Sequence, residues 1–142
     1  MKIAVIGATG YVGNAVVKEL AERGHDVAAF ARNTGKVFAA DNVQAVATDV
    51  NAADFADKLQ GFDAVVSAFN PGWSNPNIGA DFAKGAAAIT EAAKAAAVPY
   101  LLVVGGAGSL YVAPGVQLID TPEFPQEIFA GANAARNLLT DL

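Results

Sequence analysis

Residues 2–13 read KIAVIGATGYVG, an apolar run followed by glycines at positions 7, 10 and 13. The run Lys2–Ile6 is short, apolar and bounded by a glycine, which is typical of a buried strand. From position 11 the pattern changes, because Val12, Val16 and Leu20 recur four residues apart on one face of a helix. The stretch therefore predicts a strand, a glycine turn and a helix in direct succession.

The rest of the chain repeats this alternation. Further strands are expected at Asp26–Ala31, Val43–Thr48, Phe62–Ala68 and Tyr100–Val104. Helices are expected at Tyr11–Arg23, Lys36–Ala40, Ala52–Leu59 (capped by Asn51), Ile78–Ala97 and Phe124–Leu142. Strands that alternate with helices imply parallel β–α–β units, so we expect an α/β fold with a doubly wound parallel sheet and helices on both faces. Residues 105–124 are too long for a simple connector, and we expect them to form a functional flap.

Composition excludes several classes of protein. With 142 residues we expect a single domain, 1–142. The absence of cysteine and the presence of only one histidine exclude disulfides, thiolate sites and a multi-histidine cage, so no metal site is expected. A net charge of −5 disfavours a nucleic-acid partner. No apolar stretch is long enough to span a bilayer, so we expect no membrane partner and a cytoplasmic location.

The three glycines of residues 7–13 are suited to different tasks. Gly7 permits a tight turn, Gly10 permits close approach of a pyrophosphate to the backbone, and Gly13 permits close packing of helix on strand. Free N–H groups of Thr9, Tyr11 and Val12 and the positive end of the helix dipole would then hold the anion. The motif thus predicts a dinucleotide site, and the alternative is a glycine-rich turn of another doubly wound fold that binds no nucleotide.

The spacing G-x-x-G-x-x-G resembles that of atypical short-chain dehydrogenase/reductases, and most of all the small NmrA-like NAD(P)H-binding reductases related to flavin and biliverdin reductases and to epimerases. The stretches that carry the resemblance are KIAVIGATGYVG, FDAVVSAFNPG, YLLVVGGAGSL and APGVQLIDTPEFP. The resemblance implies a Rossmann-like NAD(P)-binding domain with five strands in the order 3-2-1-4-5. Such proteins usually continue past the final helix, so the chain is expected to be truncated at its C-terminus relative to them.

Cofactor choice is expected to depend on the end of the second strand. An acidic side chain there would bind the ribose hydroxyls of NAD, whereas a basic one accommodates the 2′-phosphate of NADP. This chain has Arg32 and Asn33 and no carboxylate. We therefore expect NADP(H) to be preferred, with NAD(H) also accepted. The alternative is that Arg32 is a solvated surface residue.

The resemblance implies further contacts at the carboxyl ends of strands. Asp49 and Val50 match the pair that contacts adenine, Ala68, Phe69 and Asn70 match the wall beside ribose and nicotinamide, and Gly105 begins the loop after the fifth strand. The alternatives are that Asp49 caps a helix and that Phe69 is a core aromatic.

Catalytic residues are less well indicated. The Tyr-x-x-x-Lys pair of active short-chain dehydrogenases is absent, because Tyr111 has Gly115 four residues on. Ser109 and Tyr111 could donate a hydrogen bond to a substrate oxygen, or they could merely shape the flap. Trp73 could stack on a flat substrate, pack locally or contact a second subunit.

Two hypotheses follow from different classes. The first is an NADP(H)-dependent reductase that transfers hydride to a small flavin- or quinone-like acceptor and needs no protein acid. The second is a non-catalytic NAD(P)-binding module with a redox-sensing or regulatory role. A sugar-nucleotide epimerase is a more distant third, since it would need the tyrosine–lysine pair. A homodimer is compatible with either of the first two.

Overall fold

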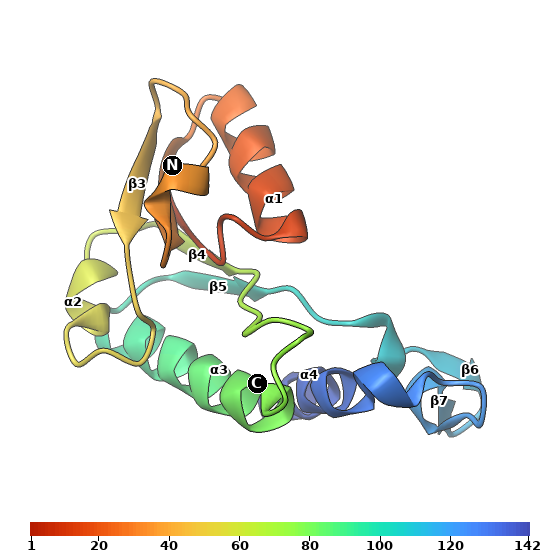
Figure 1. Ribbon diagram of the computed structural model, residues 1–142. Helices are drawn as coiled ribbons and strands as arrows, with labels where there is room; N and C mark the ends of the chain where they lie inside the picture. The colour runs from red at the N-terminus through yellow and green to blue at the C-terminus, as the bar shows by residue number, and fades with distance from the viewer. The chain divides into compact units, whose positions relative to one another are not determined.

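The computed structural model describes all of residues 1–142, and the chain divides into two compact units. The first unit comprises Met1–Phe69 and Ala87–Val104, and the second comprises Asn70–Ala86 and Gly105–Leu142. Figure 1 shows the elements in chain order, coloured from red to blue. That the whole chain acts as one domain stays a prediction.

The first unit is built on a parallel sheet whose strand order is β3-β2-β1-β4-β5, as predicted. Its strands are β1 (Lys2–Ile6), β2 (Asp26–Ala31), β3 (Val43–Ala47), β4 (Ala64–Ser67) and β5 (Tyr100–Val103). At the end of β1, Ile6 pairs with Phe30 on one side and with Ser67 on the other. Because the strands are parallel, their carboxyl ends meet at one edge of the sheet, where ligands of open α/β sheets bind.

Helices cover both faces of this sheet, as expected (Figure 1). Helix α1 (Tyr11–Glu22) buries Val17 against the face that carries Val5 and Val27. On the other face, α2 (Phe55–Lys58) and the later part of α3 (Ile78–Ala95) pack on a core around Phe30. The Phe30 ring meets the rings of Phe55 and Phe62 edge to face, with centroids 6.4 and 5.9 Å apart. This apolar core holds the strand ends in place.

Several predicted boundaries are wrong for local reasons. Asn51 does not cap a helix, because α2 is confined to Phe55–Lys58 and its N-cap residue is Asp54, while the N–H of Asn51 donates to the carboxylate of Asp49 (2.9 Å) in the turn before it. The helix predicted at Lys36–Ala40 is instead a 3₁₀ turn, η1 (Thr34–Lys36). The Asn33 side chain accepts the N–H of Gly35 and fixes that turn. The other strands and helices begin and end within two residues of the prediction, except for the start of the last helix.

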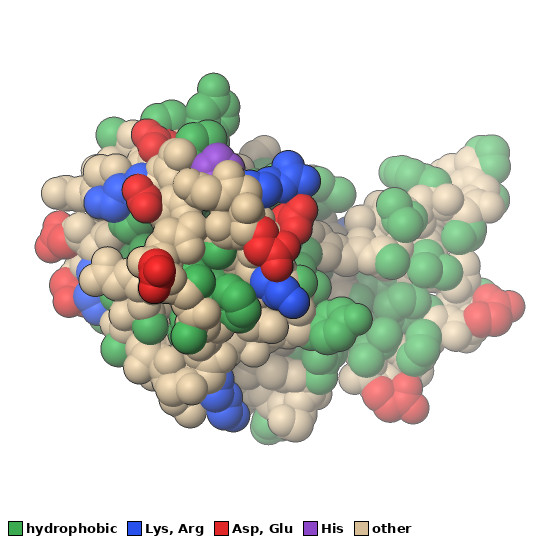
Figure 2. All heavy atoms as spheres, turned by 90° about the horizontal axis from the view of Figure 1, so that it is seen from above, with side chains coloured by type: hydrophobic (Ala, Val, Ile, Leu, Met, Phe, Trp, Pro, Cys, Tyr) green, Lys and Arg blue, Asp and Glu red, His purple; other side chains and the backbone are tan.

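The second unit contains the flap (residues 105–124) and α4 (Phe129–Asp141). The flap is not a featureless loop: it holds η2 (Ala107–Ser109), the hairpin β6 (Tyr111–Ala113) and β7 (Val116–Gln117), and η3 (Leu118–Asp120). Ile119 and Phe124 are buried and anchor it. The hairpin itself is exposed, and Figure 2 shows several green, apolar side chains on the face of this unit that is turned to the viewer.

The last helix starts later than the predicted Phe124. Pro125 is extended, with ψ of 126°, and a 3₁₀ turn, η4 (Gln126–Ile128), precedes α4. An ion pair joins the flap to α4, because one nitrogen of Arg136 lies 2.8 Å from both carboxylate oxygens of Asp120. No helix combines the length and the hydropathy that crossing a lipid bilayer demands.

Candidate functional site

The glycine turn after β1 is shaped by close backbone contacts. Gly7 has φ of +74°, and a Cβ there would lie 2.5 Å from the carbonyl oxygen of Ala68. A Cβ on Gly13 would lie 1.9 Å from the carbonyl oxygen of Gly7. Both positions therefore exclude any side chain. Gly10 differs, because its nearest neighbour at the Cβ position is the Gly7 oxygen at an ordinary 3.5 Å. The turn is thus packed on its inner side and open at Gly10.

Helix α1 begins at this open side without the usual capping groups. Gly10 is the N-cap residue, no side chain caps the helix, and its first turn has no acidic residue. The first intrahelical bond runs from the N–H of Asn14 to the carbonyl of Gly10 (2.8 Å). The earlier N–H groups of a helix have no intrahelical partner, and they carry the positive end of the helix dipole. This start of α1 can therefore bind an anion.

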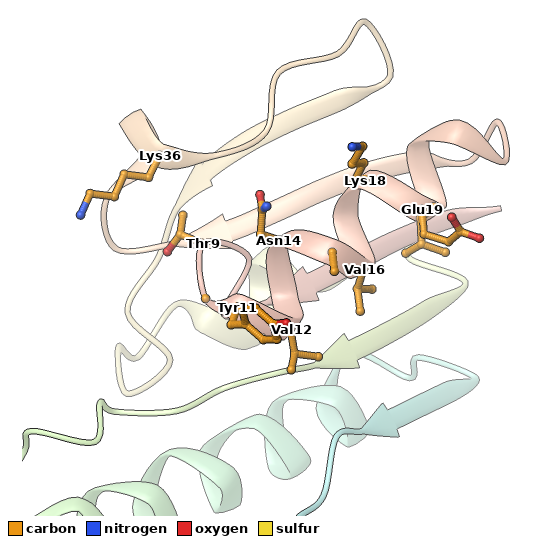
Figure 3. A pocket seen from close by; sticks show the side chains of 11 residues that line it. Thr9, Tyr11, Val12, Asn14, Val16, Lys18, Glu19 and Lys36 are labelled. Carbon is orange, nitrogen blue, oxygen red and sulfur yellow. The ribbon is translucent and has the colours of Figure 1, made fainter.

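A hollow of about 840 Å³ runs along α1 from this turn. Figure 3 shows Tyr11 and Val12 at the start of the helix, with Thr9 between them and Lys36 of η1. The side chain of Tyr11 is 98% exposed. The hollow is within the size range of small-molecule and cofactor sites. The glycine turn is thus accessible to a ligand.

Positive charge follows the carboxyl end of β2. Arg32 is exposed, and neither Arg32 nor Lys36 makes an ion pair with a protein carboxylate. Asn33 is occupied locally by its bond to Gly35. The two cations are therefore free to meet a ligand phosphate. Lys36 was missed as a site residue by the sequence reasoning, although a second basic side chain four residues after Arg32 was a visible signal.

Two further predicted contacts follow β3. After the carboxyl end of β3, the N–H of Thr48 donates a hydrogen bond to the carbonyl of Ala31 at the end of β2 (3.0 Å). Asp49 is exposed, and one of its oxygens holds the N–H of Asn51. Val50 is half-buried against the apolar core. Asp49 does not cap a helix, because α2 begins only at Phe55 and its N-cap residue is Asp54, and adenine binding by Asp49 stays a prediction.

The end of β4 lies directly beside the glycine turn. The N–H of Ala68 donates to the carbonyl of Ile6 (2.9 Å), which places the Ala68 backbone against Gly7. Phe69 is half-buried and packs on the apolar core, as its alternative interpretation proposed. Across the turn, the N–H of Ala8 donates to the carbonyl of Phe30 (3.2 Å). The structure therefore brings the predicted residues of β1, β2 and β4 to one edge of the sheet.

The remaining predicted residues belong to the second unit. The Asn70 side chain accepts the N–H of Gly72 (2.7 Å), and Gly105 is exposed. The Ser109 hydroxyl donates to the carbonyl of Gly106 (3.1 Å), and the side chain of Tyr111 is exposed on the hairpin. Ser109 is thus engaged in shaping η2. Catalytic roles for Ser109 and Tyr111 stay predictions. No group of three His, Asp or Glu side chains lies close enough to hold a metal ion.

Comparison with known proteins places the chain in a family. A family model described as NAD(P)H-binding matches residues 7–141. The chain is 41% identical over 144 residues to the uncharacterized protein YwnB of Bacillus subtilis, covering 100% of this chain and 65% of that protein.

Solved structures are similar over the same length. A candidate epimerase from Bacteroides thetaiotaomicron has a TM-score of 0.88 at 36% identity, covering 99% of this chain and 63% of that one. A candidate NADH-flavin reductase from Streptococcus pneumoniae has a TM-score of 0.81 at 38% identity, covering 99% and 64%. The chain therefore spans just under two thirds of the length of these relatives.

Proposed function

The chain belongs to the NAD(P)H-binding family, and from this membership we propose that it is an NADPH-dependent oxidoreductase that transfers hydride to a small flavin- or quinone-like acceptor. The observation that carries the proposal is the glycine turn, which is closed to side chains at Gly7 and Gly13 and open at Gly10. This arrangement fits a ligand whose pyrophosphate lies against the backbone. We further propose a cytoplasmic location.

In this proposal the chain's own residues bind and orient the dinucleotide. The N–H groups at the start of α1 donate hydrogen bonds to the pyrophosphate, and the absence of a carboxylate in the first helical turn leaves that end positive. The backbone contact between Gly7 and Ala68 fixes the floor of the turn. When bound, the reduced nicotinamide supplies the hydride, and the protein supplies position and electrostatics.

Preference for NADPH is assigned to the two free cations after β2. A forked contact from Arg32 to the 2′-phosphate is worth about 1.5–3 kcal/mol. That free energy corresponds to roughly ten- to a hundredfold discrimination against NADH. Lys36, which lines the hollow beside Thr9, adds a second positive charge. The chain as a whole has a net charge of −5, whereas two basic side chains without an ion-pair partner lie at this edge of the sheet. This local positive charge supports the proposed preference for NADPH.

A flavin- or quinone-like acceptor is proposed because the chain lacks the usual proton donor. No lysine follows Tyr111 at the fourth position, so a carbonyl substrate that must be protonated by such a pair is disfavoured. A conjugated acceptor delocalises the incoming charge and takes its proton from water. The Streptococcus pneumoniae relative named above as a candidate NADH-flavin reductase supports this choice.

The same missing pair favours a second candidate function, a non-catalytic NAD(P)-binding sensor. The two functions share the glycine turn and differ in turnover. Consumption of NADPH with riboflavin, FMN and menadione as acceptors separates them. Saturable turnover that Gly10→Asp abolishes supports the reductase, and binding without turnover supports the sensor.

The binding part of the proposal is tested by thermal unfolding with and without nucleotide. At a concentration of a hundred times Kd, a ligand adds about 2.7 kcal/mol to the free energy of unfolding. For a domain of this size this raises Tm by about 8 °C. We expect NADPH to give this shift and Arg32→Glu to remove most of it. If neither NADPH nor NADH raises the Tm of the folded wild type, the proposal is wrong.

A further inference from the structure

Trp73 has an unusual setting within the second unit. It is the chain's single tryptophan, and it is 56% exposed. Its six-membered ring nevertheless lies on the backbone of α4, because a Cβ built on Gly131 would be 2.7 Å from Cζ3 and 3.2 Å from Cη2 of Trp73. Ile78 borders the same notch, since its Cδ1 is 3.0 Å from that Cβ position. One edge of the indole is therefore held, and much of the ring is open.

The segment that carries Trp73 is fixed on both sides by side-chain bonds. Before it, the Asn70 side chain accepts the N–H of Gly72. After it, the Asn75 side chain accepts the N–H of Asn77 (2.8 Å) and donates to a carboxylate oxygen of Asp81 on α3 (2.8 Å). The backbone of Asn75 also donates to the carbonyl of Gly72 (3.1 Å). Hydrogen bonds on both sides therefore fix the turn that carries the Trp73 ring.

This presentation does little for the stability of the fold. Burial of apolar surface stabilises a protein in proportion to the area removed from water, and more than half of this side chain stays in water. Meanwhile Gly131 is a poor helix former in the first turn of α4, and the place of its side chain is taken by the indole edge, with Ile78 beside it. A stacking site instead requires an aromatic ring that is fixed in place and has one face exposed. The side chain of such a ring loses little conformational entropy when a ligand binds.

We propose that the open face of Trp73 is the platform on which the flat ring of the acceptor stacks, and that this acceptor is a planar conjugated carbonyl ring of the isoalloxazine or naphthoquinone type. This inference rests on the proposed function, since it names a binding residue for the second substrate of that reaction. The indole is electron-rich and the acceptor ring electron-poor, which favours offset stacking. The proposal concerns binding of the acceptor alone.

The single tryptophan makes the test specific. Selective excitation of tryptophan in the full chain reports only on Trp73, and it is titrated with riboflavin, with FMN and with menadione. Free N-acetyltryptophanamide corrects for absorption by the acceptor. We expect saturable quenching by at least one acceptor, and the acceptor that saturates identifies the source of the ring. The titration needs no NADPH, so its result is independent of whether the dinucleotide binds.

Variants then assign the effect to the ring. Trp73→Ala is expected to weaken acceptor binding, measured as KM or by flavin fluorescence, about tenfold, equal to about 1.4 kcal/mol. Trp73→Phe keeps an aromatic plane and should stay within about threefold of wild type. Tyr100→Ala, which removes an exposed aromatic from β5, is the matched control and should change nothing. The Tm and the NADPH-induced Tm shift should be retained in all three, which excludes loss of fold as the cause.

Two results would overturn the inference. One is quenching that stays linear with concentration for all three acceptors, as collision alone produces. The other is an acceptor affinity in Trp73→Ala equal to that of wild type. Either result with an intact NADPH-induced Tm shift refutes the stacking platform and leaves the proposed dinucleotide site standing, whereas loss of the NADPH shift in wild type refutes the proposed function itself.

Discussion

Alanine at Gly13 should mainly lower stability and alanine at Gly10 should mainly weaken nucleotide binding, although the two glycines are only three residues apart. A Cβ on Gly13 would meet the carbonyl oxygen of Gly7 at 1.9 Å and its carbonyl carbon at 2.7 Å. These are backbone atoms of a turn that is itself packed on Ala68, so they cannot move aside. A Cβ on Gly10 meets nothing closer than 3.5 Å, and φ there is −73°, which any residue adopts.

The expected magnitudes follow from these distances. Overpacking at Gly13 costs about 3 kcal/mol, the upper end for a methyl group forced into packed structure. For a domain of this size that lowers Tm by roughly 10 °C. Gly10→Ala replaces a glycine N-cap by alanine and costs about 1 kcal/mol or less. Its main effect should be on binding, where loss of about one charge-assisted hydrogen bond to the pyrophosphate weakens NADPH binding by up to about a hundredfold.

Thermal unfolding with and without NADPH measures both effects. At a hundred times the wild-type Kd, the ligand's contribution should fall in Gly10→Ala from about 2.7 to about 0.4 kcal/mol. Gly24→Ala is the control, because Gly24 has φ of +85° but no atom within 4 Å of its Cβ position, so it shows the cost of backbone strain alone. A full NADPH shift in Gly10→Ala, or a wild-type Tm in Gly13→Ala, would refute the reasoning.

Other predictions concern the core around Phe30, the ion pair of the flap and the contact of Trp73. Phe30→Ala removes a ring that is 2% exposed and should lower the free energy of unfolding by about 3–5 kcal/mol, measured in urea with an unchanged m-value. Asp120→Asn breaks the ion pair with Arg136 and should cost about 1 kcal/mol, because the pair is partly exposed, and the loss should shrink in high salt. Gly131→Ala should push Trp73 into water and shift its fluorescence to the red; an unchanged spectrum would contradict the close contact.

Much of the first unit could be predicted from the sequence because local patterns determine it. The run Lys2–Ile6 is apolar at every position after the first, as a strand covered on both faces must be, and the spacing of Gly7 and Gly13 predicts the tight turn and the close helix packing that are present. Parallel β–α–β units then leave few strand orders open.

The features that could not be predicted depend on contacts between residues that produce no periodic pattern in the local sequence. Asn51 is a residue type that favours helix caps, yet it lies in a turn held by the Asp49 carboxylate, and α2 begins only at Phe55. The β6–β7 hairpin forms within a segment that lacks strand periodicity. The notch for Trp73 joins residues of a loop and a distant helix, and nothing in either stretch alone signals their contact. Lys36 was not predicted because its place in the hollow depends on how η1 lies beside Thr9.

The contact between Gly7 and Ala68 has a consequence for the biosynthesis of the protein. Strand β1 is made first, but one of its neighbours in the sheet is β4. The N–H of Lys2 donates a hydrogen bond to the carboxylate of Asp63, which lies 61 positions later in the chain. Closing a loop of that length costs about 4 kcal/mol of chain entropy. In a chain made only as far as β3, the edge of β1 that pairs with β4 is therefore unpaired, and the glycine turn lacks its contact with Ala68. A dinucleotide site built on the contact between Gly7 and Ala68 is therefore complete only once β4 has been made, and the glycine motif alone does not complete it.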